Sequence, residues 1–277
     1  MNEILDEVFK EVLAATFAAC FVVACGGNAP ARAMEQQGAH ACGGNEVARG
    51  MVSRIVDGRT FVLDDGREIR LAAIEVPPLS PPSNASDAPD GKASAVALNA
   101  LAGADQVVLR SAEIASDHYG RLVAYAYTMR DGDELFVQGE LIADGFARVG
   151  DRVGRRCAGE LLSREKAARK ARLGLWADPY YEVLNVETLV DVPAQRGRFA
   201  LVEGKVVSVR ESGATIYVNF GRRRSEDERT FAAAGLDLKN LAGRRIRVRG
   251  WIEQRGGEDR AWIATERAEQ IENADGE

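Results

Sequence analysis

The stretch from 51 to 78 constrains this chain most, because it predicts three short strands in close succession. Apolar and polar residues alternate along it, as expected for strands with one buried face. Two pairs, Asp57-Gly58 and Asp65-Gly66, interrupt the alternation and favour tight turns. Polar groups follow the turns, among them Arg70 and Glu75. We expect these groups to converge at one end of a small barrel.

Four motifs follow one another in a fixed order: VDGRT at 56–60, RLAAIEVP at 70–77, DHYGR at 117–121 and LGLW at 173–176. Their order and spacing resemble those of the thermonuclease family. The resemblance covers residues 49–178 and implies a mainly β (α+β) fold, an OB-type barrel with three helices. It also implies a calcium-dependent site that cleaves phosphodiester bonds in nucleic acid.

The chain departs from the family pattern where the resemblance places the metal and the attacking water. Active members have carboxylates where this sequence has Arg59 and Pro78, an aspartate in place of Glu75 and a threonine in place of Val76. An arginine keeps its positive charge at any working pH, and it can pair here with Glu75 or with Asp57. We therefore expect no cofactor, with Glu75 as a weak calcium ligand in case the site still functions.

Two arginines of the family pattern remain, Arg70 and Arg121. Arginine binds phosphate through two parallel hydrogen bonds and stabilises the negative charge of phosphoryl transition states. No residue clearly replaces the lost base, although Asp87 and Asp90 lie in the polar loop 79–91. The candidate catalytic residues are Arg70, Arg121, Glu75 and Asp57.

The rest of this domain predicts helices at 93–101, 136–144 and 157–172 and strands at 106–110 and 122–129. Tyr125 and Tyr127 share one face of the last strand. Such residues are core residues or pack against a nucleotide. Tyr125 is therefore a candidate for nucleic-acid binding.

After a polar connection at 179–197, residues 198–272 predict a second small OB-like barrel, followed by a tail at 273–277. We expect strands at 199–210, 215–220, 244–254 and 261–265, with a helix at 230–241. OB barrels stack bases on aromatic side chains, so Tyr217 and Trp251 are candidate platforms, and core packing is the alternative. The alternating arginines of 244–249 suit a basic groove or the solvent side of a strand.

The beginning of the chain predicts export. Residues 12–24 are apolar, too few for a membrane span and suited to a secretory signal, although the flank before them is acidic. The following Cys25 resembles the acylated cysteine of a bacterial lipoprotein, and Ala31 and Ala33 offer an ordinary cleavage site instead. A buried amphipathic helix is the third possibility.

We interpret 1–25 as the leader and 26–48 as a linker. The mature protein is then periplasmic or anchored through Cys25, without a transmembrane helix. Export leaves Cys42 and Cys157, which we expect to form a disulfide in an oxidising compartment.

The charge of the chain restricts its function. A net charge of −6 argues against a protein that coats nucleic acid, so any polyanion site must be local. Two functions remain. One is an exported thermonuclease-like protein with a degenerate hydrolysis site for nucleic acid or a phosphate ligand. The other is a non-catalytic binding or scaffold protein that uses two OB-type barrels, with single-stranded nucleic acid or a nucleotide as a possible ligand.

Overall fold

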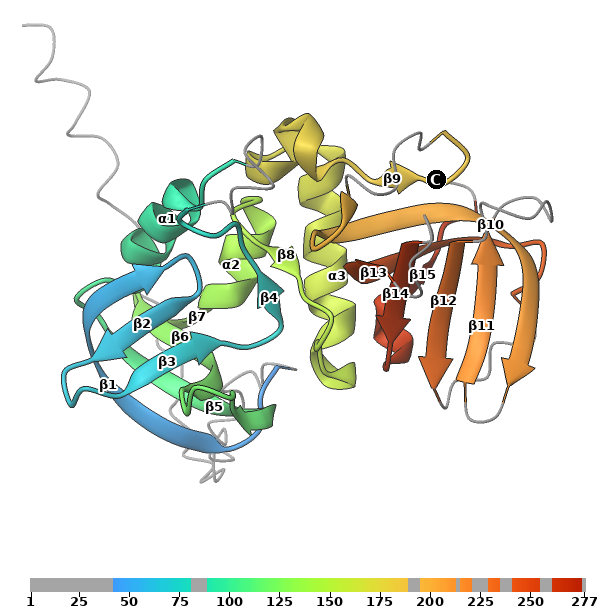
Figure 1. Cartoon of the computed structure of the whole chain (residues 1–277). Coiled ribbons are helices and arrows are strands. Elements are labelled where there is room, and N and C mark those ends of the chain that lie inside the picture. The colour runs from blue at the N-terminus through green and yellow to red at the C-terminus, as the bar shows by residue number, and fades with distance from the viewer. Residues whose placement is uncertain are drawn as a thin grey trace, which may run out of the picture. The chain divides into compact units, whose positions relative to one another are not determined.

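Five strands near the beginning of the described chain close into a barrel (Figure 1). The computed structural model describes residues 42–80, 89–188, 195–212, 215–220, 229–234, 241–254 and 261–275. The barrel strands are β1 (Glu46–Asp57), β2 (Thr60–Leu63), β3 (Glu68–Leu71), β5 (Gln106–Ser116) and β6 (Leu122–Arg130). They pair in the order β3-β2-β1-β5-β6, and the parallel pairing of β3 with β6 closes the ring. This confirms the five-stranded barrel predicted from the sequence.

Local sequence explains the first three strands. Asp57 pairs with Thr60 across the turn that joins β1 to β2. Gly66, in the next turn, has a φ of 86°, a conformation that glycine adopts without a steric penalty. The alternating apolar residues point inward, and Phe61 and Ile69 are fully buried. The two Asp-Gly pairs therefore direct three strands into one sheet, as predicted.

Three further strands complete this half of the chain. β7 (Asp133–Phe136) pairs with β6, while β4 (Ile74–Glu75) and β8 (Arg148–Val149) form a small separate pair. The helices are α1 (Lys92–Ala102), α2 (Val137–Ala143) and α3 (Arg155–Lys170), each within two residues of its predicted span. None of the helices in the described ranges is long and apolar enough to cross a bilayer.

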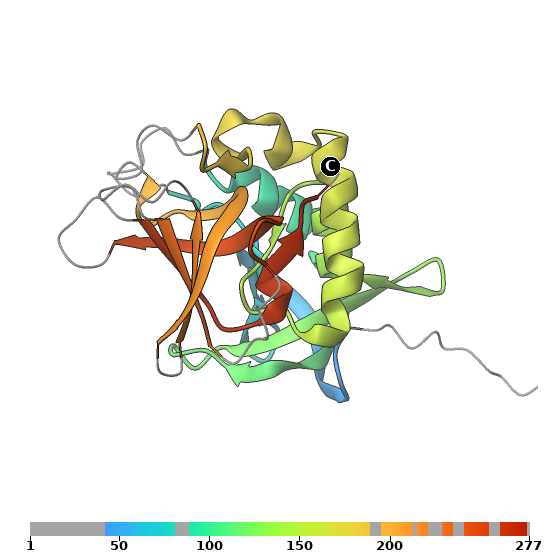
Figure 2. The ribbon, with the colours of Figure 1, turned by 90° about the vertical axis from the view of Figure 1, so that its right-hand side faces the viewer.

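The C-terminal strands form a seven-stranded sheet, most of it orange and red in Figure 2. Its strands are β9 (Leu184–Asn185), β10 (Phe199–Ser212), β11 (Thr215–Phe220), β12 (Arg229–Ala234), β13 (Arg245–Gln254), β14 (Ala261–Thr265) and β15 (Ile271–Asn273). The order is β15-β13-β14-β12-β11-β10-β9, and β13 also pairs with β10. This sheet is not closed into a barrel, so the prediction of a second small OB-like barrel is corrected.

The predicted helix at 230–241 was also wrong. Arg229–Ala234 is strand β12, which pairs with β11 on one side and with β14 on the other, while residues 235–240 lie outside the described ranges. Three consecutive alanines favour a helix locally. Hydrogen bonding to two neighbouring strands outweighs that local preference.

The barrel domain begins earlier than predicted. Cys42 is buried and forms a disulfide with Cys157 in α3, and β1 begins at Glu46. Residues 42–48, expected to be linker, are therefore part of the fold. The predicted leader, with Cys25, lies outside the described residues.

Removing this disulfide is expected to lower the free energy of unfolding by about 2–4 kcal/mol, because the bridge restricts an unfolded loop of more than 100 residues. The measurement is urea denaturation of the wild type and of Cys42→Ala/Cys157→Ala, each with and without a reducing agent. The reducing agent should lower the midpoint of the wild type and leave the double variant unchanged. An equal response of both proteins would contradict the prediction.

A buried ion pair joins α3 to the C-terminal sheet. Arg249 of β13 is fully buried and donates to both carboxylate oxygens of Glu165 in α3, over 2.9 and 3.0 Å. Glu165 also accepts the backbone N–H of Val149, and Arg249 also pairs with Glu272. Burial alone would raise the pKa of Glu165, but the charge and hydrogen bonds of Arg249 hold it below its ordinary value. Arg249 is therefore not on a solvent side, one of the alternatives considered for these arginines.

Candidate functional site

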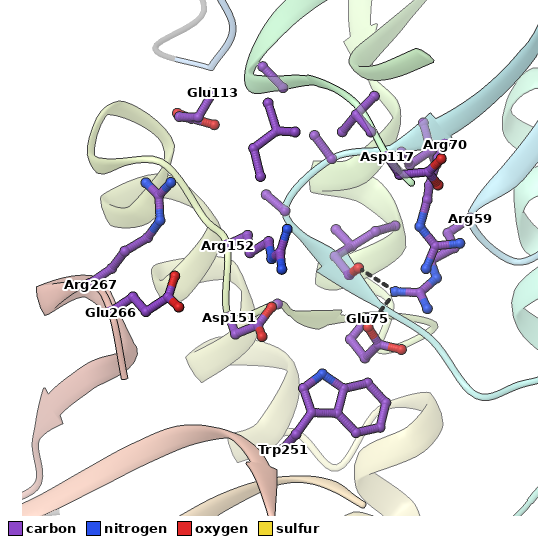
Figure 3. A pocket seen from close by; sticks show the side chains of 18 of the residues that line it. Arg59, Arg70, Glu75, Glu113, Asp117, Asp151, Arg152, Trp251, Glu266 and Arg267 are labelled. Atoms are coloured by element: carbon purple, nitrogen blue, oxygen red, sulfur yellow. Dashed lines mark hydrogen bonds and ion pairs between the residues drawn. The ribbon is translucent and has the colours of Figure 1, made fainter. Parts of the chain in front are cut away.

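A pocket of about 640 Å³ lies between the barrel and the C-terminal sheet (Figure 3). From the barrel side it is lined by Arg59, Arg70, Glu75 and Arg121. Arg59 is in the turn between β1 and β2, Arg70 is in β3, Glu75 is in β4 and Arg121 precedes β6. The pairing of β3 with both β2 and β6 brings these segments together. Of the five residues expected to converge here, these four line the pocket and Asp57 does not.

Arg59 forms an ion pair with Glu75, one of the two partners considered from the sequence. Its guanidinium also donates to the carbonyl oxygen of Ile74 over 3.2 Å. Both charged side chains are largely shielded, with 18% and 11% of their surfaces exposed. Burial raises the pKa of Glu75, although the positive charges of Arg59, Arg148 and Arg70 oppose that shift.

Asp57 has a different role from the one predicted. Its carboxylate accepts the backbone N–H of Arg59 over 2.8 Å, as in many turns that begin with aspartate. It is not among the residues that line the pocket. Asp57 therefore shapes the turn that presents Arg59 and does not face a ligand.

The residues around Glu75 do not fit calcium. Calcium takes six to eight oxygen ligands, usually with more than one carboxylate among them. Here the carboxylate of Glu75 is paired with the guanidinium of Arg59. The described ranges contain no group of three acidic, histidine or cysteine side chains that could hold a metal. The arrangement instead neutralises Glu75 with a protein cation.

Arg121 is held by two carboxylates. It pairs with Asp117 over 2.7 Å and with Glu68 over 3.5 Å. Burial opposes its charge, but the hydrogen bond that it donates to Asp117 raises the pKa of Arg121 above its ordinary value. Its guanidinium also lies 5.0 Å from the centre of the Tyr119 ring. A phosphate that binds Arg121 has to compete with Asp117. The sequence could have indicated this pairing, because both residues belong to the DHYGR motif.

Arg70 is the more available phosphate ligand. Within the described ranges its guanidinium has no hydrogen bond or ion pair, and its side chain lines the pocket. Burial and the neighbouring charges of Arg59 and Arg121 lower the pKa of Arg70. An arginine destabilised by burial and by two other cations gains from a bound anion. Arg70 is therefore the strongest anion-binding candidate in the pocket.

The structure separates the three aromatic candidates. Tyr125 is buried in the barrel core, and its hydroxyl donates a hydrogen bond to Glu113 over 3.2 Å. The prediction that Tyr125 contacts a ligand is therefore wrong. Tyr217 packs edge-on against Trp262 at 5.6 Å and does not line the pocket. Trp251 does line it and is 41% exposed.

The substitute bases predicted from the sequence find no support. Asp90 forms an exposed ion pair with Lys92 over 2.7 Å and is not among the residues that line the pocket. Asp87 lies outside the described residues. Pro78 is exposed and has no side-chain group that could accept a proton from water.

Sequence reasoning missed the opposite wall of the pocket. Asp151 and Arg152 follow β8, and Glu266 and Arg267 follow β14 (Figure 3). Burial raises the pKa of Asp151, against the attraction of Arg152. Tertiary packing brings these segments to the barrel, so no local pattern could have indicated them.

A comparison with known families agrees with the geometry. Residues 68–178 match the family model described as Staphylococcal nuclease homologue. The matched range contains Arg70, Glu75 and Arg121 and begins after Arg59. No curated protein matches this chain.

Proposed function

We propose, on the basis of the staphylococcal-nuclease-like domain at residues 68–178, that this chain is a nuclease-related protein with a degenerate hydrolysis site that binds nucleic acid or another phosphate ligand at Arg70. One observation carries the proposal. The guanidinium of Arg59 forms an ion pair with Glu75, at the position where the family resemblance places metal-binding carboxylates. The site keeps a means of holding phosphate and lacks the means of activating water.

The chemistry of phosphodiester cleavage explains this division. Hydrolysis needs a group that orients or deprotonates water and cations that stabilise charge on the phosphoryl oxygens. Arg70 and Arg121 supply the second requirement. The exposed Pro78 cannot orient or deprotonate water, and Asp90 forms an ion pair with Lys92 outside the pocket. Binding therefore survives better than turnover.

Replacing Arg70 with glutamine is expected to weaken binding of a labelled single-stranded oligodeoxynucleotide by roughly 10- to 100-fold, the worth of a charged hydrogen bond. The control is Arg54→Gln, which removes the same charge from an exposed position in β1 outside the pocket. Binding should not differ between calcium and EDTA, and the oligonucleotide should remain intact. Wild-type cleavage that depends on calcium, or equal binding by Arg70→Gln, would contradict the proposal.

The alternative is a non-catalytic binding or scaffold protein. It does not rest on a second OB-type barrel, because the C-terminal sheet is not closed into one. Both alternatives share phosphate binding and differ in whether any hydrolysis persists.

We also propose that the protein is exported, as a periplasmic protein or one anchored through Cys25. The apolar stretch at 12–24 supports export. The disulfide between Cys42 and Cys157 supports it as well, because such bonds persist in oxidising compartments.

A further inference from the structure

Trp251 is unusually placed for a large aromatic side chain in a strand. It is 41% exposed and lines the same pocket as Arg70. Figure 3 shows its indole beside Glu75. Phe199 packs edge-on against the indole at 5.6 Å and supports it from within the sheet. The indole is thus held in place, with part of its surface open to the pocket.

The strand fixes where this indole points. Side chains two residues apart in a strand lie on the same face, so Trp251 shares its face of β13 with Arg249. Arg249 is locked against α3 by its two hydrogen bonds to Glu165. This register directs the next side chain on that face, Trp251, into the pocket of the nuclease-like domain.

We propose that the C-terminal sheet supplies the base-binding wall of this pocket, so that its ligand is a nucleoside monophosphate or a terminal nucleotide. The base stacks on Trp251, and the phosphate binds Arg70. This inference rests on the phosphate binding proposed above. It places the two halves of the chain around one ligand, instead of giving each half its own nucleic-acid surface.

The dimensions and charges of the pocket fit such a ligand. About 640 Å³ is within the usual range for small-molecule sites. Indole stacks on any base because every base has a π face, whereas a guanidinium recognises phosphate. Arg152 lies between the two ends of the pocket in Figure 3 and provides a second cation for the phosphate. Glu253, two residues beyond Trp251, disfavours the reverse orientation of the ligand.

The test measures binding of adenosine 5′-monophosphate and of inorganic phosphate to the full chain by titration calorimetry. Trp251→Ala should weaken binding of the nucleotide by roughly 5- to 100-fold, the effect of one lost base-stacking contact, and leave phosphate binding unchanged. Trp251→Phe keeps an aromatic face and should bind nearly as well as the wild type. Tyr217→Ala, which removes an aromatic ring from the same sheet outside the pocket, should have no effect.

The possible failures can be told apart. If Trp251→Ala binds the nucleotide as the wild type does while Arg70→Gln does not, the base-binding wall is wrong and the proposed function stands. Loss of affinity in Tyr217→Ala would move the base to a separate surface of the C-terminal sheet and also overturn the inference. If neither the nucleotide nor phosphate binds the wild type, the proposed function falls and this inference falls with it.

Discussion

Calcium-dependent cleavage of single-stranded DNA is expected to appear in the double variant Arg59→Asp/Pro78→Glu and to be absent or far slower in the wild type. The first change removes the cation that neutralises Glu75 and puts a second carboxylate beside it. Two neighbouring carboxylates repel each other, and a divalent cation relieves that repulsion. The second change supplies a general base, a group that typically contributes 10²- to 10⁴-fold to a rate.

The single variants show whether the two changes act together. Arg59→Asp alone should bind calcium without much cleavage, and Pro78→Glu alone should do neither, because parts of one site do not contribute independently. Calcium should raise the melting temperature of each variant that carries Arg59→Asp and leave that of the wild type unchanged, because a ligand stabilises the folded state that binds it.

A matched control separates the site from general electrostatics. The variant Arg54→Asp/Pro78→Glu makes the same change in net charge at an exposed residue of β1 outside the pocket, and it should remain inactive. Calcium-dependent cleavage by the wild type that the double variant does not exceed would show that another residue activates water. The reading of Arg59 as an inhibitory cation would then be wrong.

Local sequence predicted the three opening strands of the barrel because their determinants are local. Asp57-Gly58 and Asp65-Gly66 mark the turns, and alternation marks which side of each strand is buried. The ion pair of Arg59 with Glu75 was one of two predicted pairings. It could be predicted because opposite charges that lie at the same end of a barrel attract each other. In such cases a short pattern determines the contact.

The remaining features depend on contacts between distant segments. β12 is alanine-rich and is a strand through its pairing with β11 and β14. Tyr125 has an aromatic ring on which a ligand could stack, yet it is buried in the core. The hold of Asp117 on Arg121, by contrast, is local and was missed, since the motif drew attention to the arginine alone.

Replacing Arg249 with methionine is expected to lower the free energy of unfolding by up to about 3–5 kcal/mol. The change removes the two short hydrogen bonds to the buried carboxylate of Glu165 and leaves that carboxylate only its longer 3.4 Å pair with Arg169. Methionine has nearly the volume of arginine, so the cavity it leaves is small. Urea denaturation measures the change. Because the pKa of Glu165 is lowered in the fold, the stability from this pair is present above the ordinary pKa of glutamate. It is lost as the pH falls through the lowered folded-state pKa.

Two comparisons identify the buried charge as the cause. Arg245→Met removes an arginine from the same face of β13, where its pairs with Glu187 and Glu203 are partly exposed, so it should cost less than about 1 kcal/mol. Adding Glu165→Gln to Arg249→Met removes the buried charge that has lost its short pair and keeps an acceptor for the N–H of Val149, so it should recover part of the loss. Equal effects of the two arginine changes, with no recovery, would mean that side-chain packing joins α3 to the sheet. The orientation of Trp251 would then not depend on this ion pair.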